Sequence, residues 1–266
     1  MDSQRLTLPP KKLDRRPDGS GPRKYRRIFH HDLSIATENN HDDEESTGNE
    51  VWLGSLCLAR YLRFLSSNSD VRAQLWGPKA PSRCCSTLEL GAGTGLAALV
   101  ASTLDICTGG HVVASDIVTQ VPLLQENIET NMGLLKCCMT ALPLDWRHPD
   151  WKQPQGAAEG QRIRLALGLE PSSSPQLVLC ADLCYQRINI EPLVLVLDAL
   201  SAPRNSSECT VVLVSQSHRS PLDEKAFEQL ARARGFELQE RLPCPDYAML
   251  RRSGIAFFAL VRGNRA

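Results

Sequence analysis

The sequence lacks a net charge, a long apolar run and a signal-like amino terminus. Thirty Lys and Arg balance thirty Asp and Glu, which excludes a protein that binds nucleic acid or an acidic membrane through its overall charge. No apolar stretch approaches the roughly 18 to 20 residues needed to cross a bilayer. The first dozen residues carry Arg5, Lys11 and Lys12 but no apolar segment typical of a secretory signal. We therefore expect a soluble, intracellular protein.

The cysteines also lack a familiar spacing. Ten are present, and none forms a C-x-x-C pair, so zinc knuckles and thioredoxin-like redox sites are not indicated. Several stand in apolar runs, as Cys180 does beside Leu179, where a reduced thiol packs as a small hydrophobic group. We expect free thiols and no metal site.

The first fifty residues differ from the rest of the chain. Residues 1–27 hold nine basic and three acidic side chains, whereas residues 28–50 hold seven acidic ones and neither Lys nor Arg. This composition predicts a disordered basic tail over 1–27 and an acidic arm over 28–50, followed by one domain over 51–266. Apolar residues recur from Tyr25 to Ile35, so a short strand laid on the domain is the alternative. The basic run reads as a solvated tail, with a nuclear address or a nucleic-acid tether as alternatives.

From Val51 onward, helical and strand patterns alternate. This is the rhythm of a parallel sheet built from βαβ units, and it predicts seven strands in one domain. Helices are predicted over Val51–Ser66, Leu96–Leu104, Pro122–Asn131, Glu191–Leu200 and Leu222–Arg234. Six of the strands are placed by the pattern, at Thr87–Leu90, His111–Ser115, Leu177–Ala181, Thr210–Ser215, near Glu237–Leu242 and at Ile255–Val261.

A long connection interrupts this rhythm. Residues 147–175 are rich in Pro, Gly, Ser and Gln, and they exceed the few residues of an ordinary loop. We predict an inserted surface loop, with a short amphipathic helix at Gln161–Leu169 as a possible element within it.

The most informative segment runs from Leu88 to Leu96, where an apolar strand leads into three alternating glycines and a helix. Such a turn exposes main-chain N–H groups to a ligand, and side chains would block the approach. A dinucleotide site usually has G-x-G-x-x-G, but Leu96 stands at its third glycine position. Glu89, before the first glycine, would also repel a pyrophosphate and suits a cationic or hydroxylated ligand better.

The next predicted strand ends in Ser115-Asp116, about twenty residues beyond the glycines. An acidic residue at this place can accept both hydroxyls of a ribose. A strand-terminal Asp is equally often a helix cap, so the indication comes from its combination with the glycine turn.

At these residues the sequence resembles the class I, seven-β-strand S-adenosylmethionine-dependent methyltransferases, whose first strand and loop read E/D-L-G-x-G-x-G. More narrowly, it is similar to the family 16 protein-lysine methyltransferases over roughly residues 50 to 262. Further motifs carry the resemblance: Val51-Trp52 at the start of a helix, Leu144-Asp145-Trp146 after the third strand, and Ala181-Asp182-Leu183-Cys184-Tyr185 at the end of the fourth, with Arg219 before the last helix. The fold implied is α/β and Rossmann-like, with a seven-stranded sheet that is mostly parallel, an antiparallel last strand and helices on both faces.

The resemblance also implies a cofactor, S-adenosyl-L-methionine, and residues that contact it. Asp116 would hold the ribose and Trp146 would flank the adenine, although Trp52 and Trp146 could equally be packing residues. Asp182 and Tyr185 would face the acceptor and are the predicted catalytic residues, with a structural N-cap as the alternative for Asp182. The full predicted cofactor-binding set is Trp52, Glu89, Gly91, Ala92, Gly93, Asp116, Trp146 and Ala181.

The predicted function is methyl transfer to a lysine side chain of a protein substrate. We expect a monomer in the cytoplasm, the nucleus or both, which does not bind a membrane and contacts nucleic acid only if the basic tail does so. Two alternatives stay open: a methyltransferase acting on a small molecule or another protein side chain, and a non-catalytic module that binds the cofactor and a partner.

Overall fold

The computed structural model describes residues 33–37, 49–77, 80–201, 209–217, 220–240, 242–243 and 254–263, together with the backbone of residues 24–27. Residues 1–23 of the predicted tail and Arg219 lie outside this part of the chain. Among the described residues, no helix combines the length and the apolar character needed to span a membrane.

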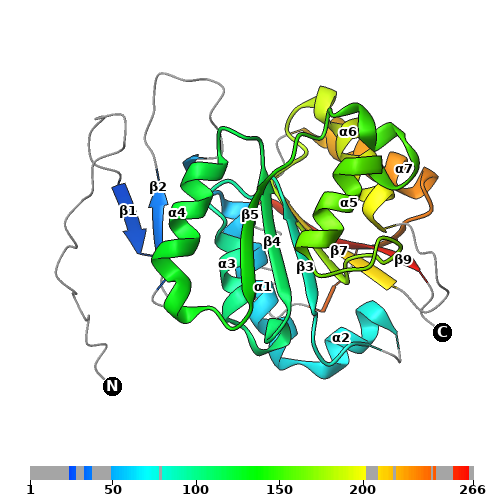
Figure 1. The fold of residues 1–266 in the computed structure, drawn as a ribbon. Coiled ribbons are helices and arrows are strands. Elements are labelled where there is room, and N and C mark those ends of the chain that lie inside the picture. Colours follow the sequence, from blue (N-terminus) through cyan, green and yellow to red (C-terminus); the bar gives the residue numbers. More distant parts are fainter. Residues whose placement is uncertain are drawn as a thin grey trace.

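Seven strands form one sheet in the order β5-β4-β3-β6-β7-β9-β8 (Figure 1). The strands from β5 to β7 pair in parallel, and β9 is antiparallel to both of its neighbours. This arrangement confirms the predicted fold class. The strand bounds are β3 Ser86–Leu90, β4 His111–Asp116, β5 Cys138–Pro143, β6 Leu177–Ala181, β7 Cys209–Ser217, β8 Glu237–Gln239 and β9 Ile255–Gly263.

Helices cover both faces of the sheet. Alternate strand residues face opposite sides, so Val112 packs among α1, α3 and α4 while Leu88 packs among α5, α6 and α7. The helix bounds are α1 Leu53–Ser67, α2 Ser69–Trp76, α3 Leu96–Thr103, α4 Val121–Asn131, α5 Ala157–Ala166, α6 Arg187–Ser201 and α7 Pro221–Ala233. Short 3-10 turns are η2 Asp105–Cys107, η3 Met132–Leu134, η4 Pro149–Lys152 and η5 Pro154–Gly156.

The prediction of a surface loop over 147–175 is wrong. This segment connects β5 to β6 and forms two 3-10 turns followed by helix α5. The helix begins four residues before the short helix that the sequence indicated at Gln161–Leu169. Trp151 and Ile163 are buried in the core on that face of the sheet. The guanidinium of Arg164 is also buried and donates hydrogen bonds to the carbonyls of Ser173, Gln155 and Ala199. The connection is therefore part of the helical layer.

The predicted disorder of 1–27 is wrong for its last four residues. Residues 24–27 form strand β1, which pairs antiparallel with β2, Ser34–Thr37. Leu33, Ile35 and Ala36 are buried, and β2 lies along α4. Part of the acidic arm is thus a strand laid on the domain, as the apolar residues around Ile35 indicated.

Candidate functional site

The predicted site residues gather at one edge of the sheet. Gly91 follows β3, Asp116 ends β4, Trp146 follows β5 and Asp182 follows β6. The carboxyl ends of these parallel strands meet at this edge, and the strand order changes direction between β3 and β6. Open α/β sheets bind ligands at such a switch point. The structure therefore brings the predicted residues together where a ligand site is expected.

The glycine turn has a backbone that other residues adopt rarely. Gly91, Gly93 and Gly95 all have positive φ, at 57°, 54° and 79°. A Cβ on Gly91 would lie 2.5 Å from Cδ2 of Leu183 and 3.1 Å from Cζ2 of Trp146. The Trp146 ring therefore lies against the turn, where a planar base can be flanked.

Asp116 bonds directly to the glycine turn. Its Oδ2 accepts a hydrogen bond from Gly93 N–H at 2.7 Å, and its Oδ1 accepts one from Ile117 N–H at 2.7 Å. Burial raises the pKa of this carboxyl above its ordinary value, against the opposing effect of the two amide donors. A carboxylate offers about four lone-pair sites, so two acceptor positions are left after these bonds.

Glu89 faces the interior of the domain. It is 1 % exposed, and its Oε2 accepts a hydrogen bond from Ala98 N–H in the first turn of α3 at 2.8 Å. Burial raises its pKa from an ordinary value of 4.5 to about 8, and the nearby Asp116 adds to the rise. Glu89 therefore caps helix α3 and supports the turn, a role that the sequence prediction of a cofactor contact did not include.

Asp182 holds two main-chain segments. Its Oδ2 accepts a hydrogen bond from Gly54 N–H at 2.7 Å, and its Oδ1 accepts one from Ser217 N–H at 2.6 Å. It is 6 % exposed and has a φ of 57°, a conformation uncommon for a residue with a side chain. The carboxylate thus binds the first turn of α1 from a distant segment, although the N-cap residue of that helix is Trp52, and ties the turn to the end of β7.

The aromatic candidates and Ala181 are half-buried at the same edge. Trp52 directly precedes α1, Ala181 is the last residue of β6, and Tyr185 lies just before α6. Partial exposure is what a ligand-facing side chain needs, so their predicted contacts with cofactor or acceptor stand as predictions.

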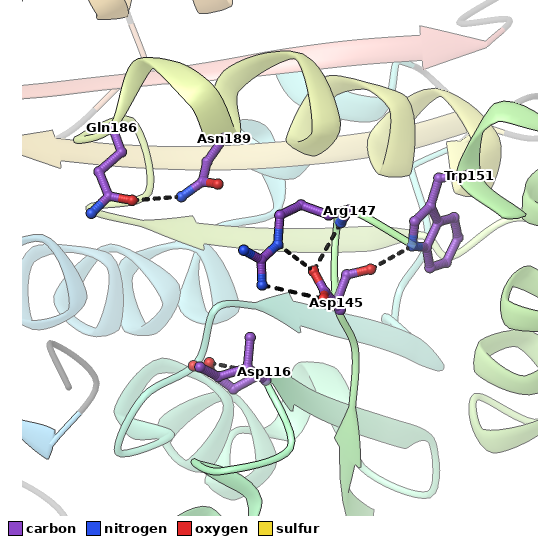
Figure 2. A network of polar contacts seen from close by, with 7 residues as sticks. Asp116, Asp145, Arg147, Trp151, Gln186 and Asn189 are labelled. Atoms are coloured by element: carbon purple, nitrogen blue, oxygen red, sulfur yellow. Dashed lines mark hydrogen bonds and ion pairs between the residues drawn. The ribbon is translucent and has the colours of Figure 1, made fainter. Parts of the chain in front are cut away.

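Polar pairs border this edge (Figure 2). The Nε of Arg147 donates to Oδ1 of Asp145 at 3.1 Å, and Trp151 Nε1 donates to the Asp145 carbonyl at 2.9 Å. Asn189 Nδ2 donates to Oε1 of Gln186 at 2.9 Å. These hydrogen bonds are separate from those of Asp116, whose oxygens accept from Gly93 and Ile117.

Three residues of the site were not predicted from sequence. Leu183 packs on Gly91, and Gly54 approaches Asp182 so closely that a Cβ there would lie 2.4 Å from Oδ2. Asn127 of α4 donates a hydrogen bond to the carbonyl of Thr94 in the glycine turn at 2.9 Å. All three contacts join segments far apart in the chain, and only Gly54, a glycine in the first turn of an apolar helix, could have been noticed from the sequence.

The residues of the edge fit a nucleoside that carries a ribose and a planar base. The turn requires glycine at Gly91, Asp116 has acceptor positions for hydroxyl groups, and Trp146 lies against the turn. The part of the chain that the structure describes holds no group of three or more His, Cys, Asp or Glu side chains suited to a metal ion.

Comparison with known proteins agrees with this geometry. Residues 30–159 match the family model described as lysine methyltransferase. Over this segment, about half of the chain, the sequence is similar to the lysine methyltransferases. The match includes the glycine turn, Asp116 and the Leu144-Asp145-Trp146 motif, so the resemblance noted from the sequence is confirmed over these residues.

Three individual proteins illustrate the similarity. Human methyltransferase-like protein 22 is 34 % identical over 109 residues, which are 40 % of this chain and 23 % of that protein. The protein-lysine N-methyltransferase EFM6 of Saccharomyces cerevisiae is 29 % identical over 133 residues, 48 % of this chain and 52 % of that protein. The matches thus span about half or less of these relatives. Aeropyrum pernix fibrillarin, solved with natively bound S-adenosyl-L-methionine, has a TM-score of 0.47 at 11 % identity, covering 89 % of this chain and 97 % of fibrillarin.

Replacing Glu89 by Gln should flatten the pH dependence of stability. With a folded pKa of about 8 and an ordinary value of 4.5, the folded chain keeps a proton that the unfolded chain loses, so stability falls as pH rises through this window. Gln accepts the same bond from Ala98 and does not ionise. Between about pH 6 and pH 8.5 we expect the wild-type midpoint of thermal unfolding to fall more than that of E89Q. Parallel midpoints across this range would contradict the assignment.

Replacing Asp182 by Ala should destabilise the fold as well as impair the site. It leaves the buried amide of Gly54 and the partly buried amide of Ser217 without their acceptor, at about 1–3 kcal/mol each. We expect urea unfolding to show a loss of roughly 2–6 kcal/mol for D182A, and a smaller loss for D182N because one amide keeps an oxygen acceptor. D105A is the control, since Asp105 is exposed and pairs with Lys136 at the opposite end of the sheet, and its midpoint should stay near wild type. A wild-type midpoint for D182A would mean that Asp182 does not hold α1.

Proposed function

We propose that this chain is an S-adenosylmethionine-dependent methyltransferase that modifies a lysine side chain of a protein. The observation that carries the proposal is the glycine turn at the switch point of the sheet, with Asp116 bonded to it. The lysine methyltransferase family match over residues 30–159, and a relative named a protein-lysine N-methyltransferase, support the choice of acceptor.

Each residue of the edge then has a role. Bound S-adenosylmethionine supplies a methyl group activated as a sulfonium. Asp116 holds the ribose hydroxyls, Trp146 flanks the adenine, and the glycines let the ligand approach the backbone. Trp52 and Ala181 line the remaining wall of this pocket.

The acceptor amine must lose its proton before it reacts. A lysine has an ordinary pKa of about 10.4, so forming the neutral amine at pH 7 costs roughly 4 to 5 kcal/mol. Exclusion of water lowers this cost because it disfavours the charged form, and Tyr185 with Trp52 provides aromatic surface for that purpose. Asp182 orients the amine, and its own position is set by Gly54 and Ser217. Positioning of nitrogen and methyl at close range supplies most of the acceleration.

The surface around this edge favours a macromolecular acceptor. Nine large apolar side chains are exposed in the described part of the chain. Five of them lie at the carboxyl edge of the sheet, three in the first turns of helices and two directly after a strand. Exposed apolar groups around a site are typical of a protein-binding surface. The five are Leu53, Ile117, Val118, Ile188 and Leu222, which we call the apolar rim.

Radiolabelled S-adenosylmethionine, incubated with the full-length chain and a cell extract, tests the proposal. We expect label in a protein band and methyl-lysine in its digest by mass spectrometry. Label only in small soluble products would favour a small-molecule methyltransferase. Saturable cofactor binding by calorimetry without any transfer would favour the non-catalytic module, and no binding by folded protein would overturn the proposal.

Polar substitutions in the apolar rim should weaken binding of the protein substrate alone. Ile188 and Leu222 are 77 % and 78 % exposed, and they begin α6 and α7 at the site edge. We expect I188S and L222S each to raise KM for the labelled protein about tenfold through lost apolar contact, with cofactor affinity unchanged. L165S is the matched control. Leu165 is 80 % exposed, like the two rim residues, but it lies near the C-terminus of α5, which leads to the amino end of β6 and not to its carboxyl end. Equal KM values for all three variants would contradict the rim.

A further inference from the structure

Strand β2 is docked on helix α4 by two asparagine side chains. Asn131 Oδ1 accepts a hydrogen bond from Ser34 N–H at 2.8 Å, and its Nδ2 donates to the Ser34 carbonyl at 2.9 Å. Asn127 Oδ1 likewise accepts a hydrogen bond from Ala36 N–H at 2.6 Å, and its Nδ2 donates to the Ala36 carbonyl at 3.2 Å. Both asparagines are buried. Each side-chain amide therefore takes the place of a peptide group in a neighbouring strand.

The spacing of helix and strand makes this pairing regular. Four residues along a helix advance about 6 Å, and two residues along a strand advance about 6.6 Å. Asn127 and Asn131 are four residues apart, and the residues that they bind, Ala36 and Ser34 respectively, are two residues apart. Two consecutive amide pairs thus fit without distortion of either element.

The two asparagines differ in their third bond. The Nδ2 group of Asn131 also donates to the Asn127 carbonyl within α4, at 2.7 Å. The Nδ2 group of Asn127 instead donates to the carbonyl of Thr94, in the glycine turn, at 2.9 Å. Asn131 therefore holds only the arm, whereas Asn127 holds the arm and the turn.

The bonded strand decides how the Asn127 amide is oriented. Ala36 N–H can only donate, so it requires the oxygen of the amide to face β2. The NH₂ group then has one hydrogen for the Ala36 carbonyl and one for Thr94. Thr94 lies between Gly93, whose N–H donates to Asp116, and Gly95, which precedes α3 in a left-handed conformation. The shape of the turn is thereby connected to the docking of β2.

We propose that Asn127 is a positioning residue that couples strand β2 to the nucleoside-binding turn. This proposal rests on the proposed function of the turn. Under it, the segment over 33–37 supports the cofactor site through Asn127, although none of its own residues is predicted to contact the cofactor. Displacing β2 loosens the turn and weakens binding of S-adenosylmethionine.

Matched variants of the full-length chain test this coupling. N127D and N131D each remove the NH₂ donors of one asparagine while keeping its shape. We expect N127D to raise the calorimetric Kd for S-adenosylmethionine about tenfold or more, and N131D to change it less than about threefold. Hydrogen exchange at the amides of Gly93 and Gly95 should accelerate in N127D alone. Equal Kd values and equal exchange in the two variants would overturn the proposal.

A second pair acts from the strand and leaves both asparagines in place. A36P removes the N–H that orients Asn127, and S34P removes the N–H bound by Asn131. We expect A36P to weaken cofactor binding more than S34P does. This comparison tests the coupling even if N127D fails to fold. A Kd for A36P equal to that of S34P would contradict the coupling. If the wild-type chain does not bind S-adenosylmethionine, the proposed function fails, and the exchange rates of the turn still test the coupling.

Discussion

Carboxylates that accept hydrogen bonds from main-chain amides hold the functional edge of this protein together. Glu89 binds the first turn of α3, Asp116 binds the glycine turn, and Asp182 binds the first turn of α1. Amides in helix starts and tight turns have no partner within regular structure, and an unpaired buried one costs about 1–3 kcal/mol. Each carboxylate stands at or just beyond a strand end and each amide belongs to another segment, so these bonds join the sheet to the elements that shape the site.

The same constraint links stability with function. Asp116 and Asp182 are the residues proposed to hold ribose and acceptor amine, and both already bind the backbone with each of their oxygens. Their remaining acceptor positions are directed by these bonds, which preorganises them. Asn127 extends the arrangement to β2 through Thr94. A ligand at this edge therefore meets groups whose orientation the fold has already set, and the cost of ordering them is met on folding.

The regular elements of the domain could be predicted because their patterns are local. Strand β6 has the predicted bounds, and most other elements begin or end within two residues of the prediction, since apolar periodicity is a property of neighbouring residues. The segment over 147–175 misled because its Pro, Gly and Ser content resembles that of a loop. Its burial depends on Trp151 and on Arg164, whose guanidinium is satisfied by three carbonyls. Composition does not reveal such partners.

The sequence by itself determined the glycine turn and the strand-terminal carboxylates, because glycine conformation and strand ends follow from local pattern, and the carboxyl ends of parallel strands share one edge of a sheet. Only the tertiary structure decided what these carboxylates bind. Gly54 and Asp182 are 128 residues apart, and Asn127 reaches Thr94 across 33 residues. A hydrogen bond depends on the distance between two groups in space. For groups far apart in the chain, that distance is set only when the sheet and its helices pack together.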